Sequence, residues 1–373
     1  MSEHRQEHTH GTGAAKPTPR IVLVLGGGGL KGAVQLGVVR ALDRLGIEVS
    51  EVIATSMGAL VGAALAAGKP LAEQTRMFSE LLEGGHVTGH QLRLLVNGPD
   101  RASVQQGRGY RQLLQRHFAD LQMSQLDLPF FCNALSLSTG TTRYFGLEGS
   151  PPVSVADAVY ASSCIPGVLE PLDLDGESYI DGGMAEPLGL KLAHARGPDL
   201  IIAVDLSRAD HHVAAPRRTS PTEVLSRTYE ILGDVLAEHA LHRFGGSGDI
   251  VLIKPDLREF ALREPGDLDA VIDVGDAEAC RELAAHPWTR YLCPPDVVKD
   301  VDRKADVTRD HVRLDVDLEA CINCGICAAT CATEGFAAVS MGNVVRKLYH
   351  YECVRDAACE RTCPTRAITL HHL

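Results

Sequence analysis

A glycine-rich turn between two short apolar runs most constrains how this chain can fold. Residues 25–32 (LGGGGLKG) follow the strand-like run 21–25, and residues 54–58 (ATSMG) close a second apolar run, 49–54. Glycine leaves backbone N–H groups free to face a developing oxyanion, and a serine on a sharp strand-to-helix turn presents its hydroxyl clear of the surface. The pair therefore predicts a serine acyl hydrolase with Ser56 as its nucleophile.

A nucleotide-binding turn is the first alternative, because Gly27-x-Gly29-x-x-Gly32 fits the dinucleotide fingerprint between a strand and a helix. That fold also needs an acidic residue about 20 positions further on, at the end of the second strand. In this chain Ser56 stands there instead. A P-loop is excluded as well, because Lys31 is followed by Gly32 and not by Ser or Thr.

A third segment strengthens the case for Ser56. Taken singly, Ser-x-Gly is more often a helix N-cap and Asp-Gly-Gly is an ordinary turn. Here the acidic turn follows the apolar pair 179–180, which predicts a carboxylate at a strand end. With this segment the chain resembles the patatin-like phospholipase family. The resemblance is carried in chain order by residues 27–32 (GGGLKG), 55–60 (TSMGAL), 157–167 (DAVYASSCIPG) and 181–183 (DGG).

The resemblance covers roughly residues 20–206 and implies a three-layer α/β/α sandwich around a mostly parallel sheet. It also implies a dyad without histidine, in which Asp181 is the general base that accepts the proton of Ser56 as the acyl-enzyme forms. The amides expected to form the oxyanion hole are those of Gly27, Gly28 and Gly29. The other motif glycines are Gly32, Gly58, Gly182 and Gly183.

Two positions depart from the family pattern, and one rival mechanism stays open. Ala54 stands where the family's serine turn begins with glycine, and residues 186–189 (EPLG) differ from the segment that usually follows Asp-Gly-Gly. The rival is a catalytic triad with a histidine downstream of Asp181, in the order of the α/β-hydrolases. Its candidate histidines are His194, His211, His212, His239 and His242.

Apolar runs of strand length alternate with helical stretches along the first two thirds of the chain, which predicts an α/β fold. The expected strands are 21–25, 49–54, 130–137, 179–180, 200–204 and 251–254, and the expected helices include 32–45, 56–67, 188–195 and 222–244. We expect a disordered polar tail over 1–19, the hydrolase domain over 20–293, a charged linker over 294–312 and a second domain over 313–373.

The second domain is marked by its cysteines, since seven of the eleven in the chain fall in the last 53 residues. Residues 321–331 (CINCGICAATC) have the Cys-x2-Cys-x2-Cys-x3-Cys spacing that wraps a cubane iron–sulfur cluster, with the fourth cysteine serving a neighbouring cluster. Zinc is disfavoured because it prefers two separated Cys-x2-Cys pairs. The four scattered residues Cys132, Cys164, Cys280 and Cys293 are expected to be small buried hydrophobes.

Residues 353–364 (CVRDAACERTCP) complete a resemblance to bacterial two-cluster ferredoxin domains, a small α+β fold. The resemblance implies that one four-iron cluster takes Cys321, Cys324, Cys327 and Cys363 as ligands. The other takes Cys331, Cys353 and Cys359, with Asp356 where the middle cysteine is expected. Because oxygen binds iron less tightly than thiolate in such a site, this second cluster is expected in a four-iron form with one labile iron or in a three-iron form.

Net charge and hydropathy narrow the partners. A formal net charge of -12 disfavours a nucleic-acid role based on phosphate neutralisation. No apolar stretch reaches the roughly 20 residues that span a bilayer, and the N-terminus lacks a signal-peptide core, so we expect a cytoplasmic protein. The expected partner is a lipid or another acyl-ester substrate, while a redox protein and peripheral contact with a membrane stay open.

The leading hypothesis is a lipid acyl hydrolase of the phospholipase or esterase type with an attached iron–sulfur domain for electron transfer or redox sensing. The alternative is an iron–sulfur electron-transfer or redox-sensing protein whose patatin-like domain mainly binds lipid. Labelling by a fluorophosphonate that depends on Ser56 would separate the two.

Overall fold

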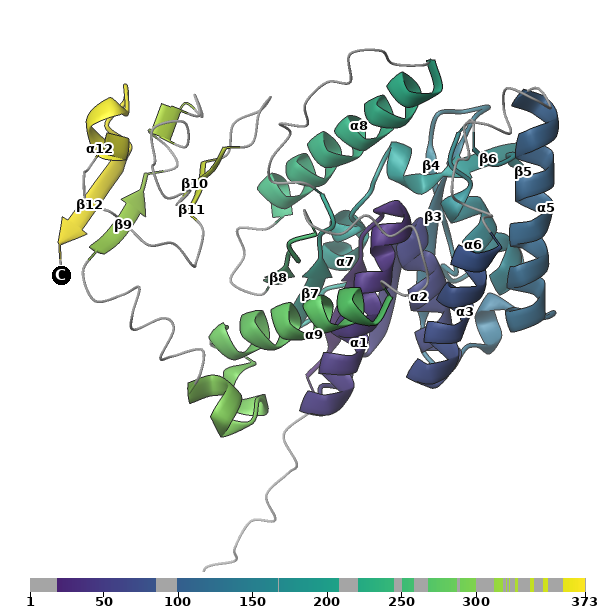
Figure 1. Ribbon diagram of the computed structural model, residues 1–373, viewed down its shortest axis with the longest axis horizontal. Coiled ribbons are helices and arrows are strands. Elements are labelled where there is room, and N and C mark those ends of the chain that lie inside the picture. Colours follow the sequence, from purple (N-terminus) through teal and green to yellow (C-terminus); the bar gives the residue numbers. More distant parts are fainter. Residues whose placement is uncertain are drawn as a thin grey trace, which may run out of the picture.

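An eight-stranded sheet forms the centre of the fold in the computed structural model (Figure 1). The structure describes residues 19–84, 99–166, 168–207, 221–244, 250–257, 268–286, 289–299 and short segments between 312 and 372. The strand order is β5-β6-β3-β2-β1-β7-β8, with β4 also paired to β3. The strands are β1 (Ile21–Leu25), β2 (Glu51–Thr55), β3 (Phe130–Ser136), β4 (Thr142–Phe145), β5 (Leu172–Leu174), β6 (Glu177–Asp181), β7 (Leu200–Val204) and β8 (Ile250–Ile253).

Five neighbouring strands, β3, β2, β1, β7 and β8, run parallel, whereas β4 and β6 pair antiparallel with β3, and β5 pairs antiparallel with β6. The α/β prediction with a largely parallel sheet is therefore confirmed. Two of these three antiparallel pairings have a plain cause. The connections from β3 to β4 and from β5 to β6 are short hairpins, which cannot return a chain to a parallel register.

Helices cover both faces of the sheet. They are α1 (Val34–Leu45), α2 (Met57–Ala66), α3 (Leu71–Glu83), α5 (Pro99–Phe118), α6 (Val155–Ser163), α7 (Leu190–Ala195), α8 (Pro221–Phe244) and α9 (Leu268–Ala285). Alternate residues of β1 enter different cores, as a strand buried on both faces requires. Leu23 and Leu25 join the core formed with α1, α2, α3, α5, α6 and α9, while Val22 and Val24 join the one formed with α7 and α8.

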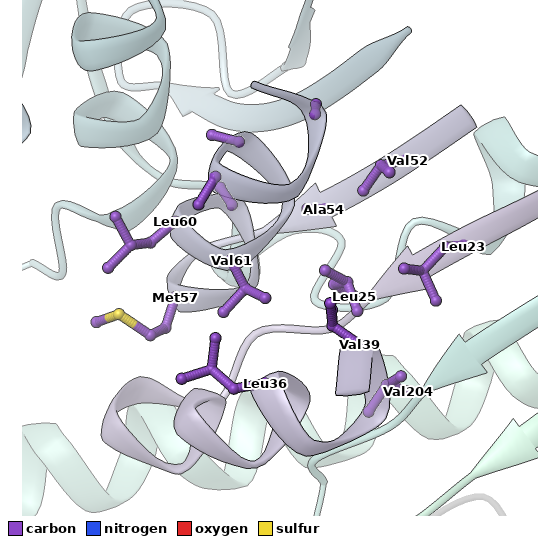
Figure 2. Close-up of a cluster of buried hydrophobic side chains, with 14 of the residues drawn as sticks. Leu23, Leu25, Leu36, Val39, Val52, Ala54, Met57, Leu60, Val61 and Val204 are labelled. Atoms are coloured by element: carbon purple, nitrogen blue, oxygen red, sulfur yellow. The ribbon is translucent and has the colours of Figure 1, made fainter. Parts of the chain in front are cut away.

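The larger core fixes the first two helices on the parallel strands (Figure 2). Leu36 of α1 and Leu60 of α2 lie in one cluster with side chains of β1 and β2. Helix α2 approaches the sheet so closely that a Cβ at Gly58 would lie 2.5 Å from the carbonyl oxygen of Leu25. Since real Cβ atoms do not come that close, only glycine fits at this position.

The described segments from residue 312 onward form two small two-stranded sheets. Strand β9 (Val312–Val316) pairs antiparallel with β12 (Ile368–His372), and β10 (Phe336–Ala338) pairs antiparallel with β11 (Val345–Lys347). Helix α12 (Ala358–Thr362) precedes β12. Within the described part of the chain, no helix combines the length and the apolar character needed to cross a bilayer.

Candidate active site

Ser56 occupies a strained turn between β2 and α2. Its backbone has φ 56° and ψ −126°, outside the regions that L residues ordinarily adopt. A turn this sharp between a strand and a helix aims the side chain away from both elements, which is the arrangement of a serine nucleophile. The strain is held by tertiary contacts, because the N–H of Ser56 donates to Oγ of Ser162 in α6 at 2.9 Å.

Strand register brings Asp181 to this serine. Thr55 pairs with Asn133 of β3, and the next residue of β3, Ala134, pairs with Asp181 at the end of β6. Two strands that border β3 thus deliver Ser56 and Asp181 to adjacent places. Oγ of Ser56 donates a hydrogen bond of 2.6 Å to Oδ2 of Asp181. The structure therefore places in direct contact the two residues that the sequence singled out as a dyad.

Burial shifts the pKa of the Asp181 carboxyl group into a range suited to proton transfer. Asp181 is 0% exposed and Ser56 is 2% exposed. Burial raises the pKa of Asp181 to about 6, opposed by hydrogen bonds from Ser56, from the N–H of Gly183 and from Tyr229. The Gly183 N–H lies 2.7 Å from Oδ1. A carboxylate with a pKa near 6 is ionised at neutral pH, yet it is basic enough to accept a proton during the reaction.

The glycine turn lies beside the serine. A Cβ at Gly27 would lie 3.2 Å from Cβ of Ser56, and Gly29 has φ +58°. The N–H of Gly27 donates to the carbonyl oxygen of Pro187 at 2.9 Å. Because the Gly27 amide already donates this hydrogen bond, the amides predicted to form the oxyanion hole are reduced to those of Gly28 and Gly29. Their role stays a prediction.

The Asp-Gly-Gly turn has a steric reason for both glycines. A Cβ at Gly182 would lie 2.4 Å from the backbone oxygen of Asn133, and one at Gly183 would lie 2.9 Å from the hydroxyl oxygen of Tyr229. Asn133 also contacts the chain just beyond this turn, since its Nδ2 donates to the carbonyl oxygen of Glu186 at 2.8 Å. The motif therefore serves close packing around Asp181 as well as the turn itself.

Two contacts of the dyad come from residues that the sequence reasoning did not assign. Ser162 lies within the segment quoted for the family resemblance, so its position in the motif was the available signal. Tyr229 lies in the middle of α8, and its hydroxyl hydrogen-bonds to Asp181 and reaches Ser56. A single tyrosine in a long helix carries no pattern that could have announced this role.

Comparison with known proteins shows which family the residues of this site resemble. The family model described as patatin-like phospholipase matches residues 23–194. These residues form a patatin-like phospholipase domain. An uncharacterized NTE family protein of Mycobacterium tuberculosis is 29% identical over 231 residues, which is 60% of this chain and 60% of the relative. This chain therefore spans less than two thirds of that relative's length.

Other relatives match this chain over a small part of their own, longer sequences. Lysophospholipase NTE1 of Saccharomyces cerevisiae is 24% identical over 282 residues, covering 68% of this chain and 16% of the relative. Patatin-like phospholipase domain-containing protein 7 of Mus musculus is 30% identical over 190 residues, covering 51% and 14%. Among solved structures, VipD from Legionella pneumophila is 14% identical, with a TM-score of 0.41 over 72% of this chain and 67% of VipD.

The candidate histidines of the rival triad lie in different parts of this chain. His194 lies in α7, where its ring packs against Phe244 with 5.7 Å between ring centroids. His239 lies in α8. His211, His212 and the side chain of His242 lie outside the described residues. In the part of the chain that is described, the hydrogen bonds of Asp181 come from Ser56, Gly183 and Tyr229 rather than from a histidine.

Three of the eight predicted cluster ligands are described. Cys327 and Cys359 are buried, and Cys363 is partly buried. The N–H of Ala367 donates to Sγ of Cys363 at 3.2 Å. Burial alone would raise the pKa of Cys363, but hydrogen bonds from Thr365 and from nearby backbone amides lower it overall. Outside the described residues lie Cys321, Cys324, Cys331, Cys353 and Asp356.

The four scattered cysteines are buried, as expected. Cys132 and Cys164 belong to the larger core, and so do Cys280 and Cys293. Burial raises the pKa of Cys164 to about 12 and that of Cys293 to about 11. These thiols are therefore protonated at neutral pH and act as small apolar side chains.

Proposed function

We propose that this protein is a serine-dependent lipid acyl hydrolase in which Ser56 is the nucleophile and Asp181 the general base. The observation that carries the proposal is the hydrogen bond of 2.6 Å from Oγ of Ser56 to Oδ2 of Asp181, within a patatin-like phospholipase domain. The printed names of relatives, lysophospholipase among them, support a lipid ester as the substrate class.

The proposed reaction has two halves. In the first, the hydroxyl proton of Ser56 passes to Asp181 while Oγ attacks the ester carbonyl, and the leaving alcohol takes that proton as the acyl-serine forms. In the second, water gives its proton to Asp181 and attacks the acyl-serine, which releases the fatty acid and restores the hydroxyl of Ser56. A single carboxylate thus serves as base and acid in turn, with no net change in its protonation.

The negative charge that develops on the carbonyl oxygen needs donors near Ser56. We assign this role to the amides of Gly28 and Gly29, because Gly27 donates to Pro187. The N-terminus of α2, which begins at Met57, adds a positive dipole end at the same place. An oxyanion donor contributes about 3 to 4 kcal/mol to the transition state in comparable enzymes.

We also propose that the cysteine-rich segment holds two iron–sulfur clusters, one bound by Cys321, Cys324, Cys327 and Cys363. Cys331, Cys353, Cys359 and Asp356 would hold the other. One observation among the described residues supports this proposal: Sγ of Cys363 accepts an amide N–H, and hydrogen bonds lower the pKa of this thiol. Such clusters supply one-electron transfer when bound, for a redox partner or for redox sensing. Reduced thiols of this kind favour a cytoplasmic location.

A fluorophosphonate probe tests the hydrolase. The anaerobically purified protein should be labelled on Ser56, and labelling should vanish in S56A. Absence of labelling in the folded wild type would instead favour the alternative, an electron-transfer or redox-sensing protein whose patatin-like domain mainly binds lipid. Activity on a panel of phospholipids and lysophospholipids would then define the head group and acyl chain.

Iron and sulfide counts with EPR test the clusters. Two clusters per chain are expected, and D356C should convert a labile iron of the second cluster into a stable one. A protein with a full cysteine complement but a single cluster would contradict the assignment of Asp356.

A further inference from the structure

Helix α8 brings a second hydroxyl to the dyad. The side chain of Tyr229 hydrogen-bonds to the carboxyl group of Asp181 and reaches Ser56. Its place is fixed by geometry at Gly183, where an added Cβ would lie 2.9 Å from the hydroxyl oxygen of Tyr229 and 3.0 Å from Oδ1 of Asp181. The hydroxyl oxygen of Tyr229 and Oδ1 of Asp181 therefore both lie next to the position that a Cβ of residue 183 would occupy. Ser56 donates to Oδ2, and the tyrosine approaches from the side where Oδ1 accepts the Gly183 amide.

This contact matters because Asp181 is fully buried, and a buried carboxylate is destabilised when it lacks hydrogen-bond donors. At rest it has three donors, Ser56, Gly183 and Tyr229. Once Ser56 carries an acyl group its hydroxyl proton is gone, so Oδ2 loses that donor. Gly183 and Tyr229 then hold the carboxylate while water enters.

The described titratable groups around Asp181 are neutral, so hydrogen bonds are what stabilise its ionised form. The titratable groups that interact with Asp181 among the described residues are Tyr229 of α8, Tyr110 of α5 and Cys164 after α6. Burial raises the pKa of each, so all three are neutral at neutral pH. Burial and the neighbouring Asp181 keep the pKa of Tyr229 well above its ordinary value. The tyrosine thus stays a donor over the whole working range of pH.

We propose that Tyr229 is a positioning residue of the hydrolysis, whose hydroxyl orients the ionised Asp181 toward Ser56 and holds it through the acyl-enzyme stage. The inference rests on the proposed function. The tyrosine keeps its own proton throughout, and the proton that moves is that of Ser56 and later that of water.

The test replaces the hydroxyl and follows the pH dependence. In Y229F, the acid limb of fluorophosphonate labelling and of p-nitrophenyl butyrate hydrolysis should move up by about one pH unit, since the ionised carboxylate loses a donor. The value of kcat should fall about tenfold, with KM changed less than twofold. Y291F is the matched control, because the side chain of Tyr291 is 76% exposed. It should keep the wild-type profile.

A second variant guards against a packing defect in Y229F. Tyr229→3-fluorotyrosine, introduced at this one codon, retains the ring and makes its hydroxyl a stronger donor. It should move the acid limb in the opposite direction, to lower pH. A merely structural tyrosine would not produce opposite shifts in the two variants, so equal midpoints in both would overturn the proposal.

An infrared titration separates this inference from the hydrolase proposal. The carboxyl band of Asp181, identified by its absence in D181N, should titrate at a higher pH in Y229F than in the wild type, whether or not the protein turns over. A wild type without labelling would sink the hydrolase proposal and the positioning role with it. Normal labelling with an unshifted band in Y229F would sink the inference alone.

Discussion

The patatin-like domain and the cysteine-rich segment reach their chemistry by different routes. Ser56 and Asp181 are 125 positions apart, and they meet because β2 and β6 both border β3 in a fixed register. The predicted cluster ligands lie within 42 positions of one another in the sequence, from Cys321 to Cys363. The first site is therefore set by the backbone before a substrate arrives. The second would take its geometry from the iron that its thiolates bind.

Removing one key atom from each region should give the largest contrast. S56A should lose ester hydrolysis by about 10⁴-fold or more while keeping its iron, because the nucleophile is absent but no ligand is touched. C363A should lose one cluster and keep hydrolysis within twofold. Parallel assays of ester turnover and of iron content measure both effects. If hydrolysis collapsed in C363A at normal folding, the two regions would be coupled and the contrast would fail.

A change at the close contact of α2 and β1 probes how strictly the backbone sets the first site. In G58A the new Cβ would lie 2.5 Å from the carbonyl oxygen of Leu25, so α2 must move and carry the turn at Ser56 with it. We expect a loss of about 3 kcal/mol in the free energy of unfolding, together with reduced labelling. Urea denaturation followed by tryptophan fluorescence and far-UV circular dichroism measures the first. Wild-type stability in G58A would show that the helix is free to shift.

The pH dependence should belong to the first region alone. Hydrolysis needs Asp181 ionised, and burial raises the pKa of this group to about 6, so activity should fall about fivefold from pH 6 to pH 5. The same acid limb is expected in C363A, which lacks one cluster. A limb that moved with cluster loss would indicate that iron–sulfur charge reaches the dyad.

Stability should respond to the same group with the opposite sign. The pKa of Asp181 is raised from 3.8 to about 6 on folding, so the neutral form is favoured in the folded state. Its favourable contribution is present below pH 4 and is lost as pH rises through 6, by on the order of 3 kcal/mol. Relative to wild type, D181N should therefore gain stability between pH 4 and pH 7. A difference between the two proteins that stays constant across this range would contradict the raised pKa.

The sequence predicted the parts of the first site that depend on local pattern. Apolar runs predicted strands that end near Ser56 and Asp181. They did not predict that β6 pairs antiparallel with β3, which is the pairing that sets Asp181 beside Ser56. Partners from distant segments could not be predicted, because tertiary packing alone decides them. Pro187, which takes the Gly27 amide, and Tyr229, which faces Asp181, are such cases. In the second region the spacing predicts cysteine ligands, and most of these lie outside the described residues.

The smallest effect expected comes from a glycine with no close neighbour, and it sharpens what G58A means. A Cβ at Gly233 in α8 would meet nothing within 4 Å. Alanine is a better helix former than glycine, so G233A should gain about 0.5 to 1 kcal/mol and leave labelling of Ser56 unchanged. Glycine-to-alanine substitution is thus expected to lower the free energy of unfolding at Gly58 and to raise it at Gly233. Thermal unfolding of both variants measures the pair, and a loss of stability in G233A would mean that α8 packs more tightly over the dyad than its contacts indicate.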